Sequence, residues 1–155
     1  MGAKRIDDLR AWQAARAFKL EAYRLVRGSP GALADLRYKS QLFEAVASGE
    51  ANVNEGFHRF GAGEFSHFLS FARGSIGEAQ GRVLDGIDRG YFSEHECAEC
   101  LRLGRDAMAL VTALRTSLQP YIRSRPPLRS EAQGTPGRRP SQGLRTEDAP
   151  RTKDS

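Results

Sequence analysis

The sequence predicts an all-α fold, an antiparallel up-and-down four-helix bundle followed by a disordered C-terminal tail. Three observations support this prediction. Apolar residues recur at steps of three and four in four separate stretches, which is the period of one helix face. Short glycine-containing links separate the stretches, and short links favour antiparallel neighbours. The sequence has no run of alternating β-branched residues with a hairpin turn, so no sheet is expected.

The first two helices follow from this period. In the first stretch the residues that share one face are Leu9, Trp12, Ala15, Phe18, Ala22, Tyr23 and Val26. The segment Gly28-Ser29-Pro30-Gly31 then breaks the pattern, because glycine and proline interrupt helices. The second stretch ends near Gly56, and its apolar face comprises Leu36, Leu42, Phe43, Val46 and Val53. The segment 57–63 is expected to be a link.

The third helix has the clearest period, and the fourth has the clearest start. The third face comprises Phe65, Phe68, Leu69, Ala72, Ile76, Ala79, Val83, Leu84 and Ile87. Gly90 stands where a left-handed residue is expected after the helix. Ser93 and Glu96 have the spacing of a capping box, which predicts a helix start. The fourth face comprises Cys97, Cys100, Leu101, Gly104, Met108, Val111, Leu114 and Leu118. Pro120 is expected to kink or end this helix.

Four glycines lower the helical propensity of the predicted third helix. They are Gly74, Gly77, Gly81 and Gly86, and each costs about 1 kcal/mol relative to alanine inside a helix. Two interpretations stay open. Packing alone holds a poor helix former in place, or the missing Cβ atoms let another backbone approach closely, within the bundle or from another subunit. Phe71 and Leu103 lie off the main apolar stripes, which favours an interface with another subunit.

The composition changes at residue 124. The segment 124–155 holds five of the seven prolines and few large apolar side chains, so it cannot bury enough surface to offset the entropy of ordering. We therefore expect one folded domain over residues 1–123 and a disordered tail over 124–155. Of the formal net charge of +5, the tail contributes +3 and the domain +2. A pI of about 9.6 is compatible with nucleic-acid binding, although +2 on the domain creates no strong field.

The lengths of the apolar runs, the N-terminal charges and the number of cysteines exclude several classes of protein. The longest apolar runs are a few residues long, whereas a membrane span needs about 20. The N-terminus has charged residues without an apolar core behind them, so it does not resemble a secretory signal. With two cysteines and no export signal, a reducing cytoplasmic location is expected.

One pattern suggests metal or redox chemistry. Cys97 and Cys100 would share a helix face, and His95 precedes them by two residues. A structural zinc site needs four ligands, and a redox pair of this spacing needs a βαβ context, which is missing. The favoured interpretation is that both thiols begin a core stripe. No catalytic triad order or phosphate loop is evident, so we expect no enzymatic activity and no cofactor.

Arginine outnumbers lysine by 20 to 4, and arginine suits forked contacts to phosphate. The candidate nucleic-acid contacts in the domain are Arg59, Arg73, Arg102 and Arg105. Arg138 and Arg139 in the tail could support them. The alternative is that these arginines form an ordinary charged surface whose acidic neighbours pair with them.

The middle of the chain carries a motif whose residues have a recognisable order and spacing: Asn52, Glu55, Gly56, Arg73, Gly74, Ser75 and Glu78. This motif resembles that of a known bacterial family of four-helix bundles, the 23S ribosomal RNA intervening-sequence proteins. The resemblance covers residues 6–121. The sequence departs from the usual pattern at Gly49 and Glu50, where the family has an aliphatic residue and proline. It also has Asn54 in place of alanine and His58 in place of glycine.

The resemblance implies a role as well as a fold. Family members form homopentamers and have no known enzymatic activity, so the chain is expected to be an oligomeric scaffold that binds RNA, DNA or a protein that handles nucleic acid. A related group, the accessory variability determinants of diversity-generating retroelements, binds a reverse transcriptase. An accessory subunit of a reverse transcriptase is therefore an alternative. A metal or redox protein using Cys97 and Cys100 is a further one.

Overall fold

A computed structural model describes residues 2–124, and this part of the chain is helical. It contains a short 3₁₀ helix η1 (Ile6–Asp8) and five α-helices. These are α1 (Arg10–Arg27), α2 (Pro30–Ala34), α3 (Leu36–Phe57), α4 (Ala62–Asp88) and α5 (Glu94–Arg123). Residues 2–124 include no strand, which confirms the all-helical prediction for them. Almost all of the predicted tail, 125–155, lies outside the described residues.

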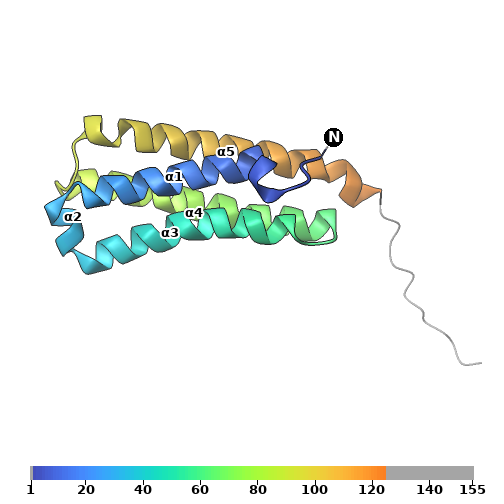
Figure 1. The fold of residues 1–155 in the computed structure, drawn as a ribbon, viewed down its shortest axis with the longest axis horizontal. Coiled ribbons are helices and arrows are strands. Elements are labelled where there is room, and N and C mark those ends of the chain that lie inside the picture. Colours follow the sequence, from blue (N-terminus) through green and yellow to red (C-terminus); the bar gives the residue numbers. More distant parts are fainter. Residues whose placement is uncertain (1, 125–155) are drawn as a thin grey trace, which may run out of the picture.

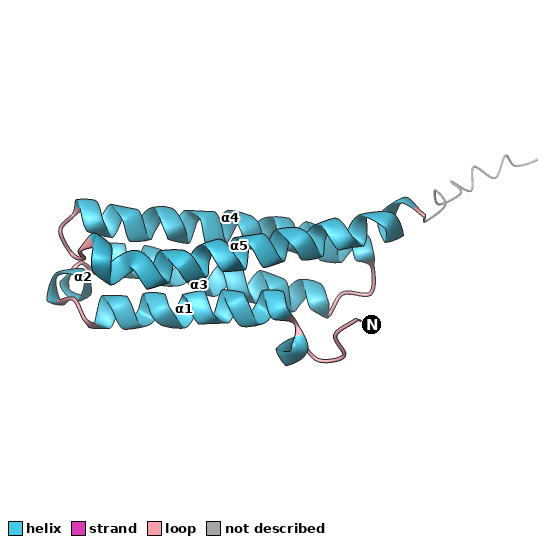
Figure 2. Cartoon of the chain, turned by 90° about the horizontal axis from the view of Figure 1, so that it is seen from above, coloured by secondary structure: helices cyan, strands magenta, loops and turns pink. Residues whose placement is uncertain are grey.

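The four long helices lie side by side, and the chain reverses direction between each one and the next (Figure 1). Each packs mainly on two of the others, in the pairs α1–α3, α3–α4, α4–α5 and α1–α5. The short helix α2 joins α1 to α3 at the end opposite the N-terminus, as the perpendicular view also shows (Figure 2). None of the helices within residues 2–124 is both long and apolar enough to cross a membrane.

The core lies along the axis between the four helices. Side chains predicted from the apolar period are fully buried on every long helix, among them Phe18, Leu42, Leu69, Ile76 and Val111. Burying side chains of this size stabilises a fold by about 1.5–3 kcal/mol each. The predicted stripes therefore converge on one core, except at Leu36 and Leu84, which are 69% and 50% exposed.

The helix ends follow local capping chemistry, and two of them were predicted. Ser93 accepts a hydrogen bond from the Glu96 backbone N–H at 3.2 Å, while the Glu96 side chain accepts from the Ser93 N–H at 2.7 Å. This is the predicted capping box. Gly90 has φ of 74°, which confirms the left-handed residue after α4. Pro120 does not end α5, which continues to Arg123.

The break predicted after the first helix contains a helical turn of its own. Pro30 occupies the first turn of α2, where its missing N–H has no helical partner to lose. The Ser29 hydroxyl caps this turn by accepting from the Ala32 N–H at 3.2 Å. The predicted link 57–63 is shorter than expected, because α3 includes Phe57 and α4 begins at Ala62.

The four glycines of α4 have different surroundings. A Cβ atom on Gly86 would overlap the Tyr38 hydroxyl and the Phe92 ring, so this glycine permits a close approach within the fold. A Cβ on Gly77 would make an ordinary 3.6 Å contact with Met108. Gly74 and Gly81 have nothing within 4 Å of a Cβ position, so packing within residues 2–124 does not require them.

The two apolar residues predicted to lie off the stripes also differ. Phe71 on α4 is 51% exposed, and its ring packs on the His67 ring with centroids 4.6 Å apart. Leu103 is partly buried and packs against the core, so it does not form an exposed patch. Only Phe71 of this pair offers an apolar surface.

Candidate functional site

Two of the predicted arginines already have acidic partners three or four positions away in the chain. Arg102 donates to Glu99 at 2.6 Å and to Asp106 at 2.7 Å. The hydrogen bond to Glu99 is the main reason why the pKa of Arg102 is raised. Arg59 pairs with Glu55 and lies 4.9 Å from the centre of the Phe68 ring. Exposed pairs of this kind contribute little stability, but they neutralise the charge that a phosphate would need.

The other two described arginines lie on different helices. Arg105 is exposed on α5, three positions from Arg102, and has no ion pair within residues 2–124. Arg73 lies on α4, and its Nε is buried without a hydrogen-bond partner in the described part of the chain. Arg138 and Arg139 lie outside the described residues. The structure places the four described arginines on two helices and a loop, because Arg59 lies between α3 and α4.

Three of the seven motif residues, Asn52, Gly56 and Ser75, lie where α3 packs against α4. The Asn52 amide donates to the Ser48 carbonyl at 2.8 Å, and the Ser48 and Ser75 hydroxyls lie 2.8 Å apart. A Cβ on Gly56 would lie 2.7 Å from the Phe65 ring and 2.9 Å from the Phe68 Cβ, so glycine lets α4 approach there. These positions therefore fix the packing of two helices.

The outer members of the motif lie on the surface of the same two helices. Glu78 is paired weakly with Arg82, at 3.6 Å, and Glu55 pairs with Arg59. Gly74 faces open space. Ser75 and Glu78 also line a shallow polar hollow of about 360 Å³ between α3 and α4.

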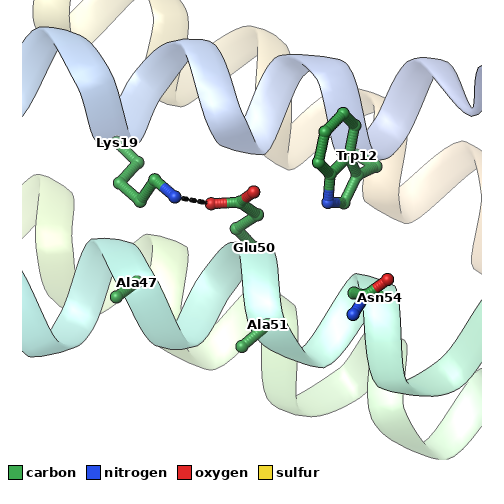
Figure 3. Close-up of a pocket in the computed structure, with 6 residues that line it drawn as sticks. All are labelled: Trp12, Lys19, Ala47, Glu50, Ala51 and Asn54. Carbon is green, nitrogen blue, oxygen red and sulfur yellow. Dashed lines mark ion pairs between the residues drawn. The ribbon is translucent and has the colours of Figure 1, made fainter. Parts of the chain in front are cut away.

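A different hollow, of about 330 Å³, lies between α1 and α3 (Figure 3). Trp12 and Lys19 extend from α1 toward α3, and Glu50 rises from α3 between them. Ala47, Ala51 and Asn54 complete the lining, so small side chains leave the space open.

The charges in this α1–α3 hollow do not cancel. The Glu50 carboxylate, 11% exposed, pairs with the ammonium of Lys19, which is 17% exposed. Arg16 also approaches Glu50, at 3.4 Å, and its guanidinium lies 5.5 Å from the centre of the Trp12 ring. Two cations share one carboxylate, so one positive charge is left over beside an indole.

A polar hollow of about 510 Å³ lies where α3 begins and α4 ends. Its acidic residue, Asp35, caps α3 by accepting from the Tyr38 N–H at 3.0 Å, and it accepts from the Tyr91 hydroxyl at 2.7 Å. These bonds lower the pKa of Asp35. Arg89, which also lines the hollow, pairs with Asp85 at 2.8 Å. These contacts hold the start of α3 against the residues that follow α4.

Comparison with known proteins settles the family. A family model described as 23S rRNA-intervening sequence protein matches residues 7–113, from η1 into α5. The chain belongs to this family. No curated protein matches the chain. The resemblance seen in the sequence is thereby confirmed, and the family's region contains all of α1, α2, α3 and α4.

In this family member, the Cys-x-x-Cys pattern lies in the core. Cys97 and Cys100 are both fully buried, whereas His95 is exposed, so the structure does not bring the imidazole to the thiols. Residues 2–124 contain no cluster of three or more histidine, cysteine or acidic side chains that could hold a metal ion. Burial is the main reason why the pKa of Cys97 rises to about 11 and that of Cys100 to about 12.

Sequence reasoning missed the α1–α3 hollow. One signal was available, because Glu50 stands between Val46 and Val53 at helical spacing, on the core side of α3. A carboxylate in such a position needs a cation on a facing helix. Glu50 and Asn54 are also positions where this chain departs from the usual pattern of its family, and both line the hollow.

Proposed function

We propose that the protein is a non-enzymatic, antiparallel up-and-down four-helix bundle that assembles into a homopentamer and acts as a scaffold for RNA or for a protein that handles nucleic acid. The observation that supports this most directly is the family match over residues 7–113. The pairing of each long helix with two neighbours agrees with the bundle class. An accessory role beside a reverse transcriptase stays a prediction of the resemblance.

Self-association is supported by the outer face of α4. Phe71 is half exposed there, and Gly74 and Gly81 follow it at steps of three and seven, so the three positions share one face. Glycine at an open position costs helix stability without an evident gain within one chain. A second copy packing closely on this face would explain both features.

Light scattering of the full chain is expected to give a mass near five times 17.1 kDa. The variant Phe71→Asp should lower the mass, because it places a charge in the proposed interface. Leu36→Asp is the matched control, since Leu36 is also exposed but begins a different helix. A monomer at micromolar concentration would contradict the proposal, and so would equal loss of mass in both variants.

Binding to RNA is supported by the basic composition and by the unneutralised charge in the α1–α3 hollow. We expect the full chain to bind a structured RNA at low salt. The logarithm of affinity should fall with the logarithm of salt concentration by roughly one unit per phosphate contact. The measurement is a binding titration at several salt concentrations. If no RNA binds even at low salt, the scaffold must act through a protein partner alone.

A further inference from the structure

A line of aromatic and basic residues runs along one face of α1. Trp12, Arg16, Lys19, Tyr23 and Arg27 follow one another at steps of four, three, four and four. Such steps keep side chains on one helix face. This face lies against α3, because Lys19 pairs with Glu50 and the Tyr23 ring lies 4.4 Å from the Phe43 ring, centroid to centroid.

The register of the two helices adds another cation. Along this α1–α3 seam, Trp12 shares a hollow with Asn54, and Tyr23 contacts Phe43. Residue numbers therefore decrease along α3 as they increase along α1. Continuing this register places Lys39 opposite Arg27. Neither Arg27 nor Lys39 has an ion pair within residues 2–124. The Arg27 guanidinium instead lies 5.8 Å from the centre of the Tyr23 ring.

The charge balance singles out this seam. Its four cations (Arg16, Lys19, Arg27 and Lys39) face the single carboxylate of Glu50, which leaves +3. The whole region 1–123 has a formal charge of only +2, so the rest of its surface is net negative. The seam therefore holds the excess positive charge of this region, and a polyanion approaching the domain is attracted more strongly to it than to the remaining surface on average.

We infer that the α1–α3 seam binds single-stranded nucleic acid. Trp12 lines the open hollow and offers a ring face on which a base stacks, and Arg27 and Lys39 offer cations for phosphates. The inference rests on the proposed RNA-binding function and locates it on the molecule. A single strand fits this chemistry because its bases are free to stack on an aromatic side chain, whereas those of a duplex are already stacked. About 22 Å of helix separates Trp12 from Arg27, which leaves room for several nucleotides.

Trp12 is the only tryptophan in the chain, so its fluorescence reports on the seam alone. The full chain would be titrated with a short oligouridylate and, separately, with an RNA duplex of equal length. Stacking of a base on the indole is expected to quench the fluorescence with the single strand and not with the duplex. Parallel anisotropy measurements on labelled strands would record binding itself.

Charge variants test the phosphate contacts without disturbing the core. The double variant Arg27→Gln/Lys39→Gln should reduce the log–log salt slope for the single strand by about 1.4, because each lost phosphate contact removes about 0.7. The matched control is Arg82→Gln/Arg123→Gln, which removes the same charge from α4 and α5 and should leave the slope unchanged. Circular dichroism would verify that both variants keep the helical content of the parent.

The outcomes separate the seam from the wider function. Single-strand binding with quenching, and with slope loss confined to the α1–α3 variant, supports the inference. If RNA binds without quenching Trp12, or if both double variants lose equal slope, the seam is the wrong place although RNA binding stands. If no RNA binds at low salt, both the inference and the proposed RNA-binding function are wrong.

Discussion

Replacing Gly86 by alanine is expected to destabilise the folded protein by roughly 3 kcal/mol, at the upper end of the usual range for overpacking. The new Cβ would overlap the Tyr38 hydroxyl and lie 2.5 Å from the Phe92 ring. Neither neighbour can easily move. The Tyr38 hydroxyl donates to the Arg82 carbonyl at 2.7 Å, and both rings are almost completely buried. The loss would reverse the usual preference of helices for alanine over glycine.

Gly77→Ala on the same helix is the matched control. Its Cβ would make only an ordinary 3.6 Å contact with Met108, so alanine should stabilise the helix by up to about 1 kcal/mol. Chemical denaturation followed by circular dichroism would measure both variants at one protein concentration, since stability of an oligomer depends on concentration. A Gly86→Ala protein as stable as the parent would show that the close approach is not rigid. Equal destabilisation by Gly77→Ala would show that the loss is not specific to the close approach at Gly86.

The helices could be predicted from the sequence because their main determinant is local. A period of three and four positions marks a buried face, and the capping box at Ser93 and the left-handed Gly90 depend on residues a few positions apart. The turn α2 was missed because Ser29 and Pro30 signal either a break or a helix start. Pro120 removes the helical hydrogen bond that its own N–H would make, yet α5 continues three residues beyond it to Arg123.

The candidate site was less predictable, and its arginines show why. Glu99 and Asp106 stand three and four positions from Arg102, so their pairing could have been inferred from spacing. The Lys19–Glu50 pair joins residues on different helices. It depends on the register of α1 against α3, which helical periodicity does not determine. Residue type alone therefore selected two arginines, Arg59 and Arg102, that are already paired, and it missed the α1–α3 seam.

The thiols of Cys97 and Cys100 are expected to resist modification in the folded protein. Only the thiolate is nucleophilic. Burial raises the pKa of Cys100 from 9.0 to about 12, which lowers its thiolate fraction near neutral pH by roughly a thousandfold. The pKa of Cys97 rises less, to about 11, with burial first and the nearby Glu96 carboxylate second among the causes. An aromatic disulfide reagent should therefore react slowly with the native chain and rapidly after denaturation.

The same shifts set a direction for stability at high pH. Each folded-state pKa lies above the ordinary value of 9.0, so the folded state holds the thiol protons more tightly than the unfolded state does. This contribution is complete below about pH 9 and is lost as pH rises through about 11 to 12. Cys97→Ala leaves Cys100 alone, so the reaction rate of that variant between pH 7 and pH 10 would report the deeper thiol. Fast reaction of the native protein at neutral pH would mean a lowered thiol pKa, and would favour the metal or redox interpretation of the Cys-x-x-Cys pair over the core interpretation.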